Sequence, residues 1–328
     1  MGAVDLPAEP EELGRAERAG QGGADRAPPQ ALELPDPEER RRAYEELRAR
    51  VDAETAERAE QVSEPGDRPD ETDQRPDGAD RRSYWDDVPR YLEMWDDYEE
   101  RVPVDRRPAA DRSADPPGSY RSHGGAYLDP ERHADAGDAI GRVCEAEPRI
   151  SADVKTVERE NRHGGWVEGL EFRLKGEDRL KEKVAEKLEA EPRMTASEAL
   201  REVADAIRYT FCFEPESYAR GYYDIKARLE SLGYEMYYSK NSWTDPEYKG
   251  INTRWVTARG QRFEVQFHTA ESFHAKHHVT HGAYERIRNP ATSRAELREL
   301  HAFQRKVCSR IQVPDGAAGI PDYRKEGY

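Results

Sequence analysis

Apolar residues follow two different spacings in the C-terminal two thirds of the chain. Alternation of apolar and polar residues predicts strands at 207–213, 251–257 and 262–268, the last two joined as a hairpin at Arg259-Gly260. Helical spacing and capping residues predict helices at about 177–190, 195–205, 216–232 and 270–287, and a last helix that begins at Ser293. Because helices and strands alternate without a regular parallel repeat, we expect an α/β (α+β) fold with a mixed β-sheet flanked by helices.

The clearest alternation is the sequence FEVQFHT at 263–269. One side of this strand would carry its apolar residues, and the other side would carry Glu264, Gln266 and His268. The apolar side indicates a core strand. The polar side is either solvated sheet surface or the floor of a site, and only the surrounding residues can decide between the two.

The N-terminal third has a different composition. Residues 1–117 contain 33 acidic residues and 18 arginines but no lysine, which gives −15 of the total net charge of −16. Such a segment buries too little apolar surface to offset the entropy lost on ordering it. We therefore predict a long, largely disordered acidic arm over 1–117, with short helices near 37–62 and 84–100, and one folded domain over 118–328.

The helix predicted near 84–100 is amphipathic. Val88, Tyr91, Leu92 and Trp95 recur at helical spacing, opposite an acidic face. We expect this apolar stripe to dock on the folded domain or on a partner. The acidic face complements the basic segment 173–183, so the helix is a candidate to lie over that segment and restrain activity, or to recruit a neutralising protein partner. A passive solubilising tail is the alternative.

Missing motifs argue against a disulfide framework, a thiolate zinc site, a Walker-type ATPase, a dinucleotide-binding unit and a hydrolase with a serine nucleophile elbow. The three cysteines form no CxxC pair, and the chain lacks GxxxxGK[ST], GxGxxG and GxSxG. No apolar run reaches 18 residues and the N-terminus is acidic, so we expect a cytoplasmic protein without a membrane segment, or one exported without a signal peptide. His274/His278 and His277/His281 have zinc-compatible i, i+4 spacing. Without HExxH, we favour solvated or capped histidines over a metal site.

The remaining candidates for chemistry are acids and bases spread over several elements. The sequence RLKGEDRLKEK at 173–183 gathers positive charge at one helix start, enough to hold a triphosphate. Asp205 and Arg208 lie where a helix meets a strand, and Glu264 lies on the polar side of another strand. Two carboxylates and substrate phosphates are a typical ligand set for Mg²⁺. This pattern indicates phosphoryl or pyrophosphoryl transfer.

These motifs, in this order, resemble the synthetase domain of RelA/SpoT-type alarmone enzymes over roughly 170–287. The pieces that carry the resemblance are RLKGEDRLKEK, DAIRYTF, KNSW with EYKGIN, FEVQFHT and HGAY. They are closest to a stand-alone, toxin-like or small-synthetase branch of the family. The resemblance implies a nucleotidyltransferase-like synthetase fold.

For the donor side, the resemblance implies that Arg173 and Arg208 sandwich the adenine of ATP while Lys175 and Lys183 hold its phosphates. Asp205 would be the magnesium ligand, with Glu202 as the alternative because the spacing to Arg208 differs from the family pattern. Glu264 would contact Mg²⁺ and activate the acceptor 3′-hydroxyl. These roles make Glu264 and Asp205 the predicted catalytic and metal-binding pair.

For the acceptor side, the resemblance implies that Tyr248 stacks on the acceptor base. Lys240 and Lys249 would lie near the acceptor phosphates. Three polar neighbours are also assigned to the acceptor: Asn252, Gln266 and His268. His281 and Tyr284 match the His-x-x-Tyr pair that is the last of the family's motifs, and they would support the site. The sequence departs from the family at 250–252 and 267–269, so the identity of the acceptor base stays open.

The predicted activity is Mg²⁺-dependent transfer of pyrophosphate from ATP to the 3′-hydroxyl of a purine nucleotide, giving (p)ppGpp- or (p)ppApp-type products and AMP. The absence of a His-Asp doublet indicates synthesis without hydrolysis. Two rivals remain. One is pyrophosphorylation of the tRNA 3′ end, which the near-neutral charge of 118–328 disfavours because RNA binding needs a basic surface. The other is a non-catalytic interaction module.

Overall fold

A six-stranded mixed sheet organises the protein. The computed structural model describes residues 38, 41–42, 44–46, 48–49, 53, 83–102, 114–122, 124–289 and 291–327. The strands of the main sheet are β3 (Trp166–Glu168), β4 (Arg208–Cys212), β7 (Arg262–His268), β6 (Ile251–Val256), β5 (Glu235–Asn241) and β8 (Tyr323–Arg324), in that spatial order. A separate two-stranded ribbon pairs β1 (Tyr120–Arg121) with β2 (Tyr127–Leu128).

The neighbouring strands β4 and β7 are parallel, and every other pairing in the main sheet is antiparallel. The predicted hairpin is present as β6 and β7, closed by a turn in which Thr257 and Gln261 pair through their backbones at 2.9 Å. Gly260 takes φ 83° in that turn, a left-handed conformation that glycine adopts without strain. The mixed sheet flanked by helices is therefore confirmed.

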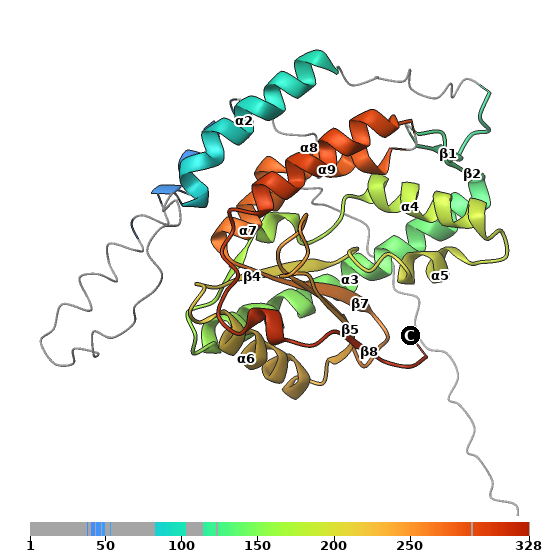
Figure 1. The fold of residues 1–328 in the computed structure, drawn as a ribbon. Helices are drawn as coiled ribbons and strands as arrows, with labels where there is room; N and C mark the ends of the chain where they lie inside the picture. The colour runs from blue at the N-terminus through green and yellow to red at the C-terminus, as the bar shows by residue number, and fades with distance from the viewer. Residues whose placement is uncertain are drawn as a thin grey trace, which may run out of the picture.

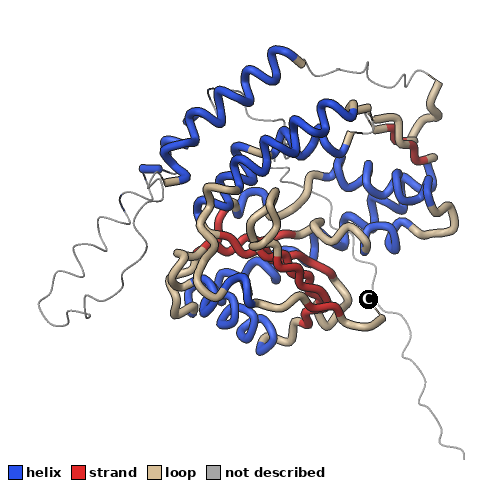
Figure 2. The backbone as a smooth tube through the Cα atoms, viewed as in Figure 1, coloured by secondary structure: helices blue, strands red, loops and turns tan. Residues whose placement is uncertain are grey.

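Helices cover both faces of the sheet (Figures 1 and 2). Their bounds are α2 (Tyr84–Arg101), α3 (Pro130–Glu160), α4 (Glu177–Ala190), α5 (Ala196–Arg201), α6 (Tyr218–Ser231), α7 (Ala270–His274), α8 (His281–Arg288) and α9 (Arg294–Cys308). Short turns are the 3₁₀ turns η1 (Leu170–Phe172) and η3 (Ala317–Gly319) and the π-helical turn η2 (Ala275–Val279). Among the described residues, no helix combines the length and apolarity that a bilayer crossing needs.

The apolar face of the sheet carries the core against α3 and α6. Phe263, Val265 and Phe267 have no solvent exposure. Tyr222 of α6 packs edge-on against Phe267 with ring centroids 4.9 Å apart. Ser151 of α3 hydrogen-bonds the Tyr209 hydroxyl at 2.8 Å. The alternation in FEVQFHT thus correctly identified the buried side of β7.

The amphipathic helix predicted near 84–100 is present as α2, and it docks on the folded domain. Its buried side chains are Tyr84, Trp85, Val88, Tyr91, Leu92, Trp95 and Tyr98. Trp95 packs on Phe303 of α9 at 5.8 Å, and the Tyr84 hydroxyl lies 2.8 Å from Nδ1 of His274. Figure 1 shows α2 running alongside α8 and α9.

This docking differs from the predicted cover over 173–183, because α2 packs its apolar side on η2, α8 and α9 instead. Recruitment of a neutralising partner stays a prediction. The described residues within 37–62 are helical. Residues 1–35 and 63–82, predicted as disordered or linker segments, lie outside the described residues. The linker predicted over 103–117 is described only from residue 114 onward.

The predicted helix over 270–287 is interrupted. It consists of α7, the π-helical turn η2 and α8, and Thr280 closes the wide turn by donating its backbone N–H to Ala275 O at 2.7 Å. We predicted solvated or capped histidines in this stretch; His274 is instead fully buried against Tyr84 of α2, whereas His277, His278 and His281 are partly exposed. The predicted helix 195–205 ends earlier, at Arg201.

Candidate active site

The polar face of the sheet carries two rows of aligned side chains. Register places Arg208 of β4, Glu264 of β7 and Arg254 of β6 directly opposite one another across three neighbouring strands. The next row runs from Gln266 to Asn252 and on to Lys240 of β5. Since residues paired across strands point to the same face, the predicted acid Glu264 stands between two arginines.

The segment after η1 brings two predicted donor-side residues to this face. The backbone N–H of Arg208 donates to Arg173 O at 2.7 Å, and that of Lys175 donates to Ala206 O at 3.0 Å. These bonds extend the sheet edge for a few residues, with Leu174 bridged to Ile207. Arg173, Lys175, Asp205 and Arg208 are therefore brought together, as the motif order predicts.

Three of the four predicted donor-side bases already have a carboxylate partner. Arg173 Nε pairs with Glu147 of α3 at 2.6 Å, Lys175 with Asp205 at 2.9 Å, and Lys183 with Glu186 at 2.7 Å. Ion pairs that are partly exposed contribute only ~0–1 kcal/mol each. The two lysine pairs can therefore exchange their carboxylates for phosphate oxygens at small cost, whereas Glu147 in the Arg173 pair is nearly buried.

Asp205 and its alternative Glu202 have different surroundings. Glu202 lies at the end of α5 and pairs with Lys187 of α4 at 2.5 Å. Burial would raise the pKa of Asp205, but Lys175 and Arg208 outweigh burial and hold that pKa below its usual value. Asp205 is therefore a carboxylate beside the bases of the site, and it is the better placed of the two acids.

The floor of the site is a chain of three side chains. Glu264 is 8% exposed, and its Oε1 accepts a 2.8 Å hydrogen bond from Nε2 of Gln266. Gln266 Oε1 in turn accepts a hydrogen bond from Nζ of Lys276, which enters from η2. Burial and the charge of Arg208 lower the pKa of Lys276 to about 7. The charges of Glu264, Cys212 and Asp205 oppose that shift of the Lys276 pKa.

The acceptor-side tyrosine is fixed by two neighbours. The Tyr248 hydroxyl donates to Asn252 Oδ1 at 2.8 Å and lies 3.1 Å from Nε2 of His268. His268 is fully buried, and its Nδ1 lies 2.9 Å from Ser272 Oγ. Burial, with the charges of Lys276 and Arg208, lowers the pKa of His268 well below its usual value, so the ring is neutral. Acceptor contact by His268 stays a prediction, since in this structure the ring holds Tyr248.

Gly250 allows this arrangement. It has φ 149°, and a Cβ on it would lie 2.7 Å from Cε1 of His268. The departure from the family pattern at 250–252 thus has a local reason, because the glycine, the buried histidine and Asn252 together shape the Tyr248 site.

The remaining predicted residues lie around these rows. Lys240 is exposed and pairs with Asp322 at 2.7 Å. Lys249 Nζ donates to the carbonyl oxygens of Trp243 at 3.0 Å and Asp245 at 2.7 Å, so it closes its own loop. His281 begins α8, and burial together with Lys276 and Arg208 lowers its pKa.

Tyr284, on the same helix, is 47% exposed and has the Arg288 guanidinium 5.4 Å from its ring centroid. Contacts of a nucleotide with Lys240, Lys249, His281 and Tyr284 stay predictions.

Sequence reasoning missed three residues of the site: Glu147, Arg254 and Lys276. Period two along 251–257 would have identified Arg254, which stacks on Tyr238 at 4.7 Å. Glu147 lies on a helix that was not predicted. Lys276 lies in a stretch that was read for its histidines, and the helix predicted there gave no sign of the π-helical turn from which Lys276 reaches Gln266.

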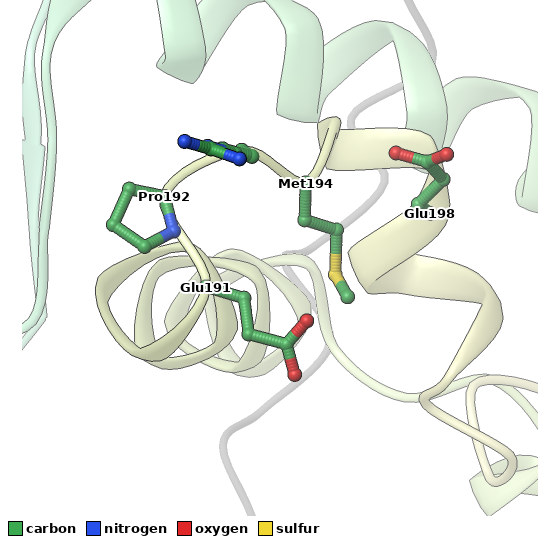
Figure 3. Close-up of a pocket in the computed structure, with 5 residues that line it drawn as sticks. Glu191, Pro192, Met194 and Glu198 are labelled. Atoms are coloured by element: carbon green, nitrogen blue, oxygen red, sulfur yellow. The ribbon is translucent and has the colours of Figure 1, made fainter.

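Two surface hollows lie away from these rows. One, of about 480 Å³, is lined by residues of the turn between α4 and α5 (Figure 3). The other, of about 390 Å³, is lined by α3, the end of α5 and the β6–β7 turn. Neither is lined by a predicted site residue.

No cluster of three or more His, Cys, Asp or Glu side chains suited to a metal occurs within the described part of the chain. A closed protein-only metal centre, such as a zinc site, thus has no support there. The pair Asp205 and Glu264 matches the one or two carboxylates that Mg²⁺ typically takes when phosphates supply its other ligands.

No protein-family model and no curated protein matches the chain. Similar solved structures include the Type VI effector Tas1 in complex with its immunity protein, with 18% identity over 54% of this chain and 96% of that one, and a TM-score of 0.38. Small alarmone synthetase 1 from Bacillus subtilis bound to its product pppGpp has 14% identity over 52% and 88%, and a TM-score of 0.32.

A GTP pyrophosphokinase family protein from Streptococcus pneumoniae has 14% identity over 56% of this chain and 90% of that one, with a TM-score of 0.35. The last two of these proteins are named for the class of enzyme that the sequence motifs resemble. At such identities and TM-scores the likeness carries no argument about the substrate or mechanism of this chain.

Proposed function

We propose that this protein is a Mg²⁺-dependent nucleotide 3′-pyrophosphokinase, which transfers pyrophosphate from ATP to the 3′-hydroxyl of a purine nucleotide and releases AMP. The observation that carries the proposal is the position of Glu264. It is a nearly buried carboxylate between Arg208 and Arg254, hydrogen-bonded on one oxygen only by Gln266. A nearly buried carboxylate between two arginines is unusual for a strand surface and suits a reaction centre.

The donor-side residues bind ATP. Arg173 and Arg208 lie on adjacent backbone segments, so their guanidinium groups can take the two faces of an adenine ring. Lys175 and Lys183 hold phosphates after they leave Asp205 and Glu186. Positive charge around the α-phosphate stabilises the AMP that departs.

Asp205 and Glu264 would hold Mg²⁺ when ATP is bound. The ion would neutralise charge on the β- and γ-phosphate oxygens. Release of Lys175 from Asp205 to a phosphate would free that carboxylate for the ion, so donor and metal binding are coupled in this proposal.

Glu264 takes the proton of the acceptor 3′-hydroxyl while the 3′-oxygen of the acceptor bonds to the β-phosphorus of ATP. The bond between that phosphorus and the oxygen of the α-phosphate breaks, and AMP leaves. Tyr248 presents its ring to the acceptor base, because its hydroxyl is held by Asn252 and His268. General-base catalysis of this kind contributes ~10²–10⁴-fold to the rate.

The test is an acceptor screen with the full chain. ATP and MgCl₂ are incubated with GDP, GTP, ADP, AMP or tRNA, and the products are separated by anion-exchange chromatography. The expected result is AMP plus a new, more acidic nucleotide with at least one mononucleotide acceptor, and its loss in Glu264→Gln. Glu230→Gln, on the exposed face of α6, is the matched control and should keep wild-type activity.

No AMP from any acceptor would overturn the proposal. Product that appears only in tRNA would support the nucleic-acid rival instead.

A further inference from the structure

Lys276 is an interior base that the sequence motifs do not account for. It comes from the π-helical turn η2, donates to Gln266 Oε1, and has its Nζ 5.9 Å from the centroid of the Tyr248 ring. We propose that Lys276 is a positioning residue, which fixes the Gln266 amide so that this amide donates to Glu264 and orients the carboxylate for proton abstraction. The inference rests on the proposed function, because it assigns Lys276 to that same site.

The direction of the amide follows from hydrogen-bond chemistry. A lysine amine at hydrogen-bond distance from the amide donates to its oxygen, and a carboxylate only accepts. With Lys276 on one side and Glu264 on the other, Gln266 has one satisfactory orientation, with Oε1 toward the lysine and Nε2 toward Glu264. Without Lys276, the amide is held at one end only, by Glu264, so the amide and the carboxylate lose their fixed orientation.

The fixed amide leaves one carboxylate oxygen for chemistry. Gln266 occupies Oε1 of Glu264 at 2.8 Å, so Oε2 is the atom directed to the acceptor hydroxyl. Burial and Arg208 lower the pKa of Lys276 to about 7. Both the ammonium and the neutral amine carry N–H donors, so the amide keeps its direction in either protonation state.

The backbone around Lys276 is shaped for this task. Thr280 N–H bonds Ala275 O across five residues, and a π-helical turn of this kind rotates side chains away from their α-helical directions. On the side away from the sheet, His274 is hydrogen-bonded to Tyr84 of α2. The turn is therefore held on both sides, by Gln266 beneath it and by α2 above it.

The test is a double-mutant cycle in the full chain with Lys276→Met, Gln266→Ala and the pair. Lys276→Met should lower kcat ~10–100-fold, the usual effect of losing a group that orients a reacting one. KM for ATP should stay within roughly threefold, because the lost interaction acts on the reaction step. In the Gln266→Ala background, Lys276→Met should lower kcat less than about twofold, because the lysine acts through the amide that this background lacks.

Two variants separate this role from general damage to the fold. Lys276→Arg keeps a donor at the site and should recover at least about a third of wild-type kcat if orientation is what matters. Lys226→Met, which removes an exposed lysine paired with Glu230 on α6, should leave kcat unchanged. Circular dichroism melts of every variant show which are folded at the assay temperature.

An active wild type with unchanged kcat in Lys276→Met would overturn this inference alone. Full additivity of Lys276→Met and Gln266→Ala would also overturn it, because the lysine would then act directly on a phosphate. A wild type that releases no AMP would overturn the proposed function, and this inference with it.

Discussion

The docking of α2 on α8 depends on a glycine, and substitution of that glycine tests the docking. Gly282 lies under the indole of Trp95, and a Cβ placed on it would be 2.3 Å from Cζ2 of that ring. Trp95 is 2% exposed and is stacked on Tyr98 at 5.1 Å. Gly282→Ala therefore inserts a methyl group where no space exists.

The two opposing effects of Gly282→Ala can be compared. Alanine gains up to about 1 kcal/mol over glycine in a helix. Overpacking a well-filled contact costs about 1–3 kcal/mol, and this contact is far inside the normal limit. We expect the single variant to lose about 1–2 kcal/mol of unfolding free energy.

Trp95→Ala removes the obstacle. Alone it should cost about 3–5 kcal/mol, as truncation of buried tryptophan does. In that background Gly282→Ala should be neutral or stabilising by up to about 1 kcal/mol, so the two substitutions couple by about 2 kcal/mol. Urea unfolding of the full chain, followed by far-UV circular dichroism, gives the four free energies. Equal destabilisation by Gly282→Ala in both backgrounds would contradict the docking of α2 at this position.

Two other predictions follow from the site. Gly250→Ala should raise KM for the acceptor ~10-fold or more while KM for ATP stays near wild type, because the new Cβ displaces His268 and with it Tyr248; an equal rise in both would contradict it. Lys276 has its pKa lowered from 10.5 to about 7, so the unfolded state binds the extra proton between those values and the lysine's contribution to stability rises with pH across that window. From pH 7 to 9, the free energy of unfolding in urea should rise in wild type relative to Lys276→Met by up to about 1.4 kcal/mol per pH unit, and by less if Lys276 is partly exposed. The difference between wild type and Lys226→Met should show no such trend. A difference independent of pH would contradict the lowered pKa.

The strands that were predicted are those with strict local alternation. The alternation in 207–213, 251–257 and 262–268 led to β4, β6 and β7 within two residues. β5 was missed because its register shifts between Met236 and Tyr238, which breaks the period of two. The long helix α3 was missed because its apolar residues are spread over many turns and Pro148 lies within it.

The candidate site was predictable where one strand held several of its residues, and not where distant segments meet. Glu264, Gln266 and His268 share one face of β7, so alternation alone grouped them. Glu147 reaches Arg173 from α3, and Lys276 reaches Gln266 from η2, through contacts 26 and 10 residues apart in the chain. Helical spacing predicted that the apolar stripe of α2 docks, but it could not show on which surface, because spacing identifies the apolar side of a helix and not the residues that cover it.

The central claim is transfer of an intact pyrophosphate group, and the fate of each phosphate of ATP tests it most directly. ATP labelled at the α-, β- or γ-phosphate is incubated with MgCl₂, the full chain and the best acceptor from the screen. The account predicts that β- and γ-labels enter the acceptor together, that the α-label stays in AMP, and that Glu264→Gln abolishes both outcomes. Transfer of the γ-label alone, with ADP as the second product, or no transfer of any label, would contradict it.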